Sequence, residues 1–209
     1  MANFEQISEM LQKGKAKDVE KLVGDALAGG GSVKDILEKG LIAGMAIIGE
    51  KFKNNQVYVP EVLIAARAMN KGMAILEPAM LKAGIKPLGT VIIGTVKGDL
   101  HDIGKNLVGM MFKGAGFKVV DLGTDVPPEK FVAAAKEHGA SLVGLSALLT
   151  TTMPNMRECI EALKAAGLAT KVMIGGAPVT QAFADEIGAD GYTPDAATAV
   201  EAGKKLAGV

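Results

Sequence analysis

The chain has 209 residues, of which 49% are hydrophobic, and its 23 basic side chains balance 23 acidic ones. This composition is typical of a globular protein with a buried core, and the balanced charge gives no indication of a nucleic-acid partner. No apolar run reaches about 18 residues, and the first residues show neither a basic nor an apolar signal region, so we expect a cytoplasmic protein without membrane contact. The single cysteine, Cys159, excludes an internal disulfide framework, and its helical context favours an inert role.

Residues 1–86 show helical periodicity and no convincing strand. Ser32 is placed to cap a helix, because Asp35 follows at a position where a carboxylate favours a helix N-terminus. The predicted helices span 4–11, 19–27, 32–52 and 60–80. Four helices joined by short loops predict a helical bundle as a first domain.

Residues 87–209 follow a different pattern, in which strand-like and helical segments alternate. The predicted strands span 90–96, 118–122, 142–145, 171–174 and a short stretch around 191–192. The predicted helices span 105–115, 128–138, 154–166, 179–187 and 196–206. This alternation predicts a second domain with the α/β class of fold, a doubly wound parallel sheet of about five strands.

The loop after the first predicted strand, Gly98-Asp99-Leu100-His101-Asp102-Ile103-Gly104, holds one of the two histidines. Asp99 lies two residues before His101, where its carboxylate can bind one ring nitrogen and leave the other available to a metal. Ligands bind at the carboxyl ends of strands in open α/β sheets, so we expect a site here.

The ends of the other strands add hydroxyls and glycines to the same edge. Ser146, Thr150 and Thr152 follow the third strand, Gly175-Gly176 follows the fourth, and the segment 192–196 follows the fifth. Each also has a structural explanation, since glycines are common in turns and threonines cap helices. Their combination with His101 favours a ligand that needs one histidine and close access to the backbone.

Four other kinds of site do not match these residues. The loop lacks the G-x-G-x-x-G spacing of a dinucleotide site, and Gly104-Lys105 is followed by Asn106 rather than the Ser or Thr of a phosphate loop. One cysteine and two histidines are too few for a structural zinc site. A receiver domain would have an aspartate at the end of the third strand, where this chain has Ser146.

The series Asp99-x-His101-x-x-Gly104, Ser146-x-Leu148 and Gly175-Gly176 resembles the three-part motif of cobalamin-binding domains of the methionine synthase type. The N-terminal half is similar to the helical cap domain of corrinoid methyl-carrier proteins. The resemblance therefore implies a cap over residues 1–86 and a Rossmann-like, cobalamin-binding domain over residues 87–209.

The resemblance also implies a role for each candidate residue. His101 would ligate cobalt in place of the dimethylbenzimidazole of cobalamin or a related corrinoid, which cycles between Co(I) and a methylated form. Asp99 would bind the other ring nitrogen, and Thr152, where many relatives have serine, would complete a relay. The remaining cofactor-binding candidates are Gly98, Asp102, Ile103 and Gly104 in the loop, Ser146, Leu148 and Thr150 in a slot for the nucleotide tail, Gly175, Gly176, Tyr192, Asp195 and Ala196 at its far end, and Met69 and Met73 in an apolar lid.

The implied function is that of a corrinoid protein that carries a methyl group and has no complete substrate site of its own. Its expected partners are a substrate-specific methyltransferase, a second methyltransferase that passes the methyl group to tetrahydrofolate or a thiol, and a reductive activation protein. Two alternatives are the small subunit of an adenosylcobalamin-dependent mutase and a B12-dependent sensor. The helical half argues against the first, and the lack of a basic element argues against the second.

Overall fold

The computed structural model describes residues 3–209. With the exception of residues 114–116, the chain divides into two compact units whose boundary lies between Pro87 and Leu88. No helix of the described residues is both long and apolar enough to span a membrane.

The first unit consists of four helical stretches, as the periodicity predicts. They are α1 (Phe4–Gln12), α2 (Ala16–Ala28), a composite stretch, and α5 (Val59–Ala83). The composite stretch contains α3 (Val33–Asp35), a π-helical segment η1 (Ile36–Ile42) and α4 (Ala43–Lys53). Ser32 begins it as predicted, since its Oγ accepts a hydrogen bond from the backbone N–H of Asp35 at 3.2 Å.

The π-helical segment was not predicted by the regular apolar spacing. Helix α1 packs closely against this region, because a Cβ on Gly40 would lie 3.1 Å from Ile7 and one on Gly44 would lie 3.1 Å from the Cα of Ser8. These two glycines therefore allow α1 to approach the backbone of the composite stretch.

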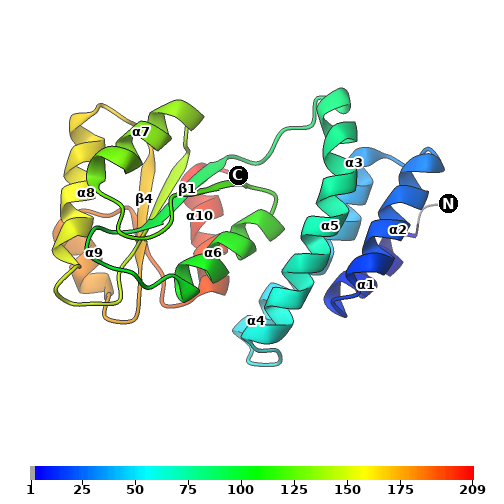
Figure 1. Ribbon diagram of the computed structural model, residues 1–209, viewed down its shortest axis with the longest axis horizontal. Helices are drawn as coiled ribbons and strands as arrows, with labels where there is room; N and C mark the ends of the chain where they lie inside the picture. Colours follow the sequence, from blue (N-terminus) through cyan, green and yellow to red (C-terminus); the bar gives the residue numbers. More distant parts are fainter. Residues whose placement is uncertain (1–2) are drawn as a thin grey trace. The chain divides into compact units, whose positions relative to one another are not determined.

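The second unit is a five-stranded parallel sheet with strand order β2-β1-β3-β4-β5, which confirms the predicted fold class. The strands are β1 (Thr90–Thr95), β2 (Lys118–Asp121), β3 (Leu142–Ser146), β4 (Lys171–Gly175) and β5 (Gly191–Tyr192). The helices are α6 (Ile103–Gly114), α7 (Pro128–His138), α8 (Pro154–Ala165), α9 (Gln181–Ile187) and α10 (Ala196–Ala207). Helices α7, α8 and α9 cover one face of the sheet, and α6 and α10 cover the other (Figure 1).

Helix α6 begins two residues earlier than predicted. The carbonyl of Asp102 accepts a hydrogen bond from the N–H of Asn106 at 2.8 Å, which closes the first turn. Ile103 and Gly104, expected in the loop, therefore belong to the helix.

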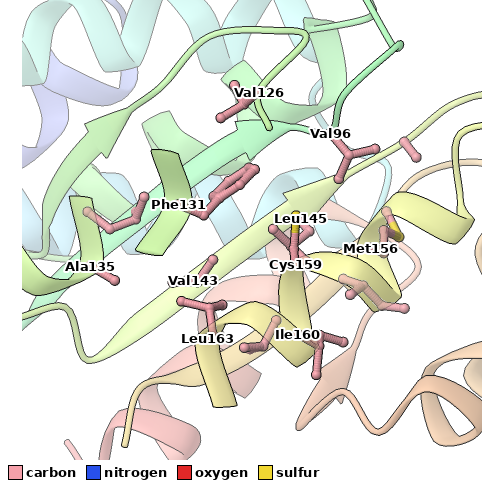
Figure 2. Packing of buried hydrophobic residues seen from close by; sticks show 14 of the residues in the cluster. Val96, Val126, Phe131, Ala135, Val143, Leu145, Met156, Cys159, Ile160 and Leu163 are labelled. Carbon is pink, nitrogen blue, oxygen red and sulfur yellow. The ribbon is translucent and has the colours of Figure 1, made fainter. Parts of the chain in front are cut away.

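The core between the sheet and α7 to α9 consists of buried apolar side chains (Figure 2). Phe131 of α7 is fully buried over β1, where a Cβ on Gly94 would lie 2.7 Å from its ring. Cys159 of α8 is buried in the same cluster, and burial together with the charges of Glu158 and Glu129 raises the pKa of its thiol to about 12. The predicted helical position of Cys159 is confirmed, and its burial agrees with the expected inert role.

Candidate functional site

Strands β1, β3 and β4 end side by side, since Thr95 pairs with Ser146 and Ser146 pairs with Gly175. From β1 the chain continues to β2, which lies toward one edge of the sheet. From β3 it continues to β4, which lies toward the opposite edge. Open α/β sheets bind ligands at such a switch point. The residues that follow β1 and β3 therefore form the candidate site.

His101 and Asp99 are in direct contact at this edge. The Nδ1 atom of His101 lies 2.8 Å from the Oδ1 atom of Asp99. The His101 side chain is 51% exposed, whereas that of Asp99 is fully buried. No residue in the described range 3–209 hydrogen-bonds to the Nε2 atom of His101. An imidazole held by a carboxylate through one nitrogen and open at the other has the arrangement of a metal-ligating histidine.

The carboxylate of Asp99 receives hydrogen bonds on both oxygens. Oδ1 accepts from the ring and the backbone N–H of His101, the latter at 3.1 Å. Oδ2 accepts from the backbone N–H groups of Leu148 and Leu149 at 2.8 and 3.2 Å. Burial alone would raise the pKa of Asp99, but the bonds from Leu148, His101 and Thr152 outweigh it and hold the pKa well below its usual range. Asp99 is therefore a fixed negative charge behind His101.

Thr152 completes this contact. Its Oγ1 atom lies 2.8 Å from Oδ2 of Asp99 and 2.9 Å from the carbonyl oxygen of Leu149. The hydroxyl carries one proton and so donates to one of these two acceptors at a time. The structure thus brings together Asp99, His101 and Thr152, the three residues of the expected relay.

Exposed apolar side chains are found in the two segments that bear this relay. Leu100 and Ile103, on either side of His101 in the sequence, are 73% and 78% exposed. Leu148 and Leu149, which follow β3, are each 42% exposed. Exposed apolar side chains grouped in this way indicate a binding surface for an apolar group.

The glycines of the site differ in what their surroundings require. Gly98 has a φ of +81°, which favours glycine, and a Cβ on Gly176 would lie only 1.8 Å from the carbonyl oxygen of Ala147. By contrast, a Cβ on Gly104 would meet no heavy atom within 4 Å. The packing of the chain therefore requires glycine at 176 but leaves open space at 104.

Several other candidates have contacts within the chain. The Asp102 carboxylate accepts a hydrogen bond from Asn106, and the Asp195 carboxylate caps α10 by accepting from Ala197 and Thr198 at 2.9 and 2.8 Å. Ser146, Gly175 and Tyr192 are the last residues of β3, β4 and β5 and are half-buried, and Thr150, after β3, is exposed. Ala196 is buried at the start of α10. In α5, Met69 is buried and Met73 is half-buried.

Sequence motifs did not reveal the side chains outside residues 97–101 that hydrogen-bond to the backbone of this loop. Thr95 donates to the carbonyl of His101, Asp125 accepts from Gly98, and Asn155 donates to the carbonyl of Lys97. Lys105 is buried and pairs with Asp121 at 2.5 Å. The partners of these bonds lie up to 58 residues apart in the sequence, so local spacing carries no sign of them.

The edge as a whole fits a metal that brings most of its own ligands. In the part of the chain that the structure describes, no three histidine, cysteine or acidic side chains gather to hold an ion. One outward-facing imidazole nitrogen, exposed apolar side chains and open space at Gly104 fit a metal in an apolar macrocycle.

Comparison with known proteins agrees with this geometry. A B12 binding domain model matches residues 89–201, and a second B12 binding domain model matches residues 4–77. The fold and the site thus define a B12-binding protein. Trimethylamine corrinoid protein 1 of Methanosarcina mazei is 46% identical over 213 residues and 96% of both chains. The chain belongs to the corrinoid proteins of methyltransferase systems, and its cofactor is cobalamin or a related corrinoid.

Two solved structures share the architecture. In the methanol:cobalamin methyltransferase complex MtaBC from Methanosarcina barkeri, one chain matches with a TM-score of 0.88 and 31% identity, over 97% of this chain and 79% of that one. A cobalamin-binding protein from Desulfitobacterium hafniense DCB-2 matches with a TM-score of 0.79 and 30% identity, over 99% of both chains.

Proposed function

We propose that this protein carries a methyl group on corrinoid cobalt between two methyltransferases, with His101 as its ligand to the metal. The observation that supports this most directly is the pair of His101 and Asp99, in which one ring nitrogen is held by a buried carboxylate and the other is open. When bound, a corrinoid supplies a cobalt ion that can accept and give up a methyl group. The chain must therefore hold the cobalt ligand in place and control its charge.

In this proposal Asp99 orients the imidazole and fixes its tautomer. Because Asp99 is ionised, it favours a proton on Nδ1, and Nε2 then presents its lone pair to the metal. Thr152 and the backbone N–H groups after β3 hold Asp99 in turn. Leu100, Ile103 and Leu148 offer apolar surface beside the ligand.

The nucleotide tail of the corrinoid is proposed to extend between the ends of β3 and β4. Ser146, Leu148 and Thr150 would line its path, and Gly175, Gly176 and the segment 192–196 would surround its far end. These residues lie at or after the carboxyl ends of β3, β4 and β5, and the ends of β3 and β4 are paired in register. The Asp195 carboxylate caps the N-terminus of α10. Asp195 and Ala196 would therefore contribute to this part of the site by positioning the start of α10.

Residues 1–86 are proposed to act as a cap that shields the cofactor, and residues 87–209 as the domain that binds it. Met73 is the stronger of the two lid candidates because part of its side chain is exposed, whereas Met69 is buried. An apolar lid would exclude competing reactants from the metal.

The proposed partners follow from the carrier role. A substrate-specific methyltransferase would load the methyl group, as the similarity to MtaBC and to a trimethylamine corrinoid protein suggests. A second methyltransferase would pass it to tetrahydrofolate or a thiol, and a reductive protein would restore the cofactor after oxidation.

The proposal is tested by reconstitution of the apo-protein with hydroxocobalamin. His101→Ala removes the proposed ligand, and His138→Ala is the matched control because His138 lies at the end of α7, in contact with Glu137. After gel filtration, the wild type and His138→Ala are expected to retain corrinoid with the same visible spectrum, and His101→Ala to lose it or change its spectrum. Identical spectra in all three proteins would exclude His101 as the ligand.

The carrier role needs a second measurement. The reduced holoprotein is mixed with a trimethylamine, dimethylamine or methanol methyltransferase and its substrate, and the visible spectrum is followed. Methylation with one of these pairs is expected. Its absence with all three pairs, in a protein that retains corrinoid, would reject these methyl donors.

A further inference from the structure

Two side chains outside the three-part motif hold the backbone of the His loop, defined here as residues 97–101. The first is Thr95 at the end of β1, which is fully buried. Its hydroxyl donates a hydrogen bond to the carbonyl oxygen of His101 at 2.8 Å. Because Thr95 belongs to a central strand, this bond ties the backbone of the histidine directly to the sheet.

The second is Asp125 in the connection between β2 and α7. Its Oδ1 atom accepts a hydrogen bond from the N–H of Gly98 at 2.7 Å, and its own N–H donates to the carbonyl of Asp99 at 3.0 Å. Asp125 therefore holds the backbone on both sides of the peptide bond that joins Gly98 to Asp99.

The backbone of Asp125 is in the left-handed region, with a φ of +54°. Asparagine and aspartate tolerate this conformation better than other residues with a side chain, but it still costs free energy. Neighbouring bonds keep it in place, since Thr95 donates to Gly123 at 2.9 Å and Val126 donates to Thr95 at 3.0 Å.

We propose that Thr95 and Asp125 are positioning residues that set the His loop in its metal-binding conformation before the corrinoid arrives. Thr95 acts on the carbonyl of His101, and Asp125 acts on the backbone of Gly98 and Asp99. The inference rests on the proposed function, because it assumes His101 as the cobalt ligand. Preorganisation of this kind reduces the ordering cost that binding must otherwise overcome.

Matched substitutions separate these roles from general stability. Thr95→Val keeps the shape and removes the donor, whereas Thr95→Ser restores a hydroxyl. Asp125→Gly keeps the positive φ and removes the acceptor, whereas Asp125→Asn retains an acceptor oxygen. Thr170→Val is the control, because Thr170 donates a similar bond to the carbonyl of Ala140 at 2.7 Å but precedes β4, at the opposite edge of the sheet.

The first measurement uses the apo-protein and hydrogen exchange of the Gly98 and His101 amides by NMR. We expect Asp125→Gly to exchange the Gly98 amide faster than the wild type, and Asp125→Asn to restore its protection. Thr95→Val is expected to speed exchange of the His101 amide indirectly, because the lost bond holds the carbonyl of the same residue whereas the amide donates to Asp99, and Thr170→Val is expected to leave both amides unchanged. Unchanged exchange in Thr95→Val and Asp125→Gly would overturn the proposal without reference to any cofactor.

The second measurement uses hydroxocobalamin reduced to Co(II) in protein labelled with nitrogen-15 histidine. The nuclear spin of the label converts the ligand splitting of the EPR spectrum from triplets to doublets only where histidine coordinates cobalt. Thr95→Val and Asp125→Gly are expected to show a smaller doublet fraction and an about fivefold higher Kd, the factor of one net hydrogen bond. Thr95→Ser, Asp125→Asn and Thr170→Val are expected to match the wild type.

The two measurements distinguish two kinds of failure. Triplets in the wild type would show that histidine is not the ligand and would remove both the proposed function and the inference. Doublets of equal fraction in all variants would leave the proposed function intact and overturn the positioning role.

Discussion

At the scale of single residues, the hydrogen bonds that the Asp99 carboxylate accepts define the site. Asp99 is fully buried yet ionised, because five hydrogen bonds from His101, Leu148, Leu149 and Thr152 reach its two oxygens. His101, in contrast, keeps one nitrogen for a partner from outside. The sequence predicted the pair of Asp99 and His101 from their spacing, since two residues suffice for the contact.

This carboxylate makes stability depend on acidity in a defined direction. The pKa of Asp99 is lower in the folded protein than the ordinary value of 3.8, so its contribution is fully present above about pH 4 and is lost as the pH falls further. In urea unfolding from pH 6 to pH 3, the wild type is expected to lose more stability than Asp99→Asn, which has no such group. Parallel losses in the two proteins would show that Asp99 contributes nothing to acid sensitivity.

Gly104 offers a prediction in which stability and binding change in opposite directions. A Cβ there meets no protein atom within 4 Å, and the residue lies in the first turn of α6. Gly104→Ala is therefore expected to leave the apo-protein unchanged or to stabilise it by about 0.5 kcal/mol, because alanine loses less backbone entropy in a helix. Gly104→Ala is also expected to weaken corrinoid binding, because the alanine side chain would occupy the open space near His101, the proposed cobalt ligand.

Thermal unfolding of the apo-protein and titration with hydroxocobalamin measure the two effects. If Gly104→Ala bound corrinoid as tightly as the wild type, the space at Gly104 would not belong to the cofactor site.

At the scale of elements, the site depends on how closely the ends of β3 and β4 approach. Gly176 follows β4 with a φ of +138°, and a Cβ there would lie 1.8 Å from the carbonyl oxygen of Ala147. Gly175 stands beside it at the end of β4, but a Cβ on it would have its nearest contact at 3.9 Å. The Gly175-Gly176 pair predicted as one feature thus contains two residues with different requirements.

Alanine substitution separates these requirements. Gly176→Ala is expected to cost about 3 kcal/mol or more, or to prevent folding, because backbone must move. Gly175→Ala is expected to fold with a change within about 1 kcal/mol and to test whether a ligand approaches that position. Urea unfolding of both variants provides the comparison, and equal stability of the two would contradict the contact at Ala147.

The elements also show where local pattern was insufficient. The strand ends were predicted to within one residue, because β-branched runs and glycines mark them clearly. The start of α6 was placed two residues too late. The hydrogen bond from Asn106 to the carbonyl of Asp102 closes the first turn, and the apolar periodicity does not reveal this bond. The π-helical segment 36–42 was missed because apolar spacing does not separate it from an α-helix.

At the scale of the whole molecule, the chain consists of two units that have their own buried side chains. Ile7, Leu41 and Leu76 belong to the helical unit, and Ile92, Phe131 and Ile160 belong to the α/β unit. The two units meet in the sequence at Pro87–Leu88, where Lys86, Pro87 and Leu88 are exposed. Exposed connections of this kind are accessible to proteases.

A protease site inserted between Pro87 and Leu88 provides a test of the proposed division. With an affinity tag at the C-terminus, corrinoid is expected to remain with the tagged fragment after cleavage, since the proposed ligand His101 and its partners Asp99 and Thr152 lie beyond residue 98. Visible absorption of the tagged fragment measures this, with the uncleaved protein as the control. Complete loss of corrinoid on cleavage would show that the helical unit is required for retention.

The sequence by itself determined that a helical part precedes an α/β part, the succession of strands and helices along the chain, and the pairing of His101 with Asp99, because these depend on periodicity and on residues close together in the chain. Only the tertiary structure decided which distant groups hold that pair. Thr152 reaches Asp99 across 53 residues, and Asp125 reaches Gly98 across 27. The physical reason is that a parallel sheet brings the carboxyl ends of separate strands to one edge, and hydrogen bonds across that edge depend on strand order and register, which local sequence does not specify.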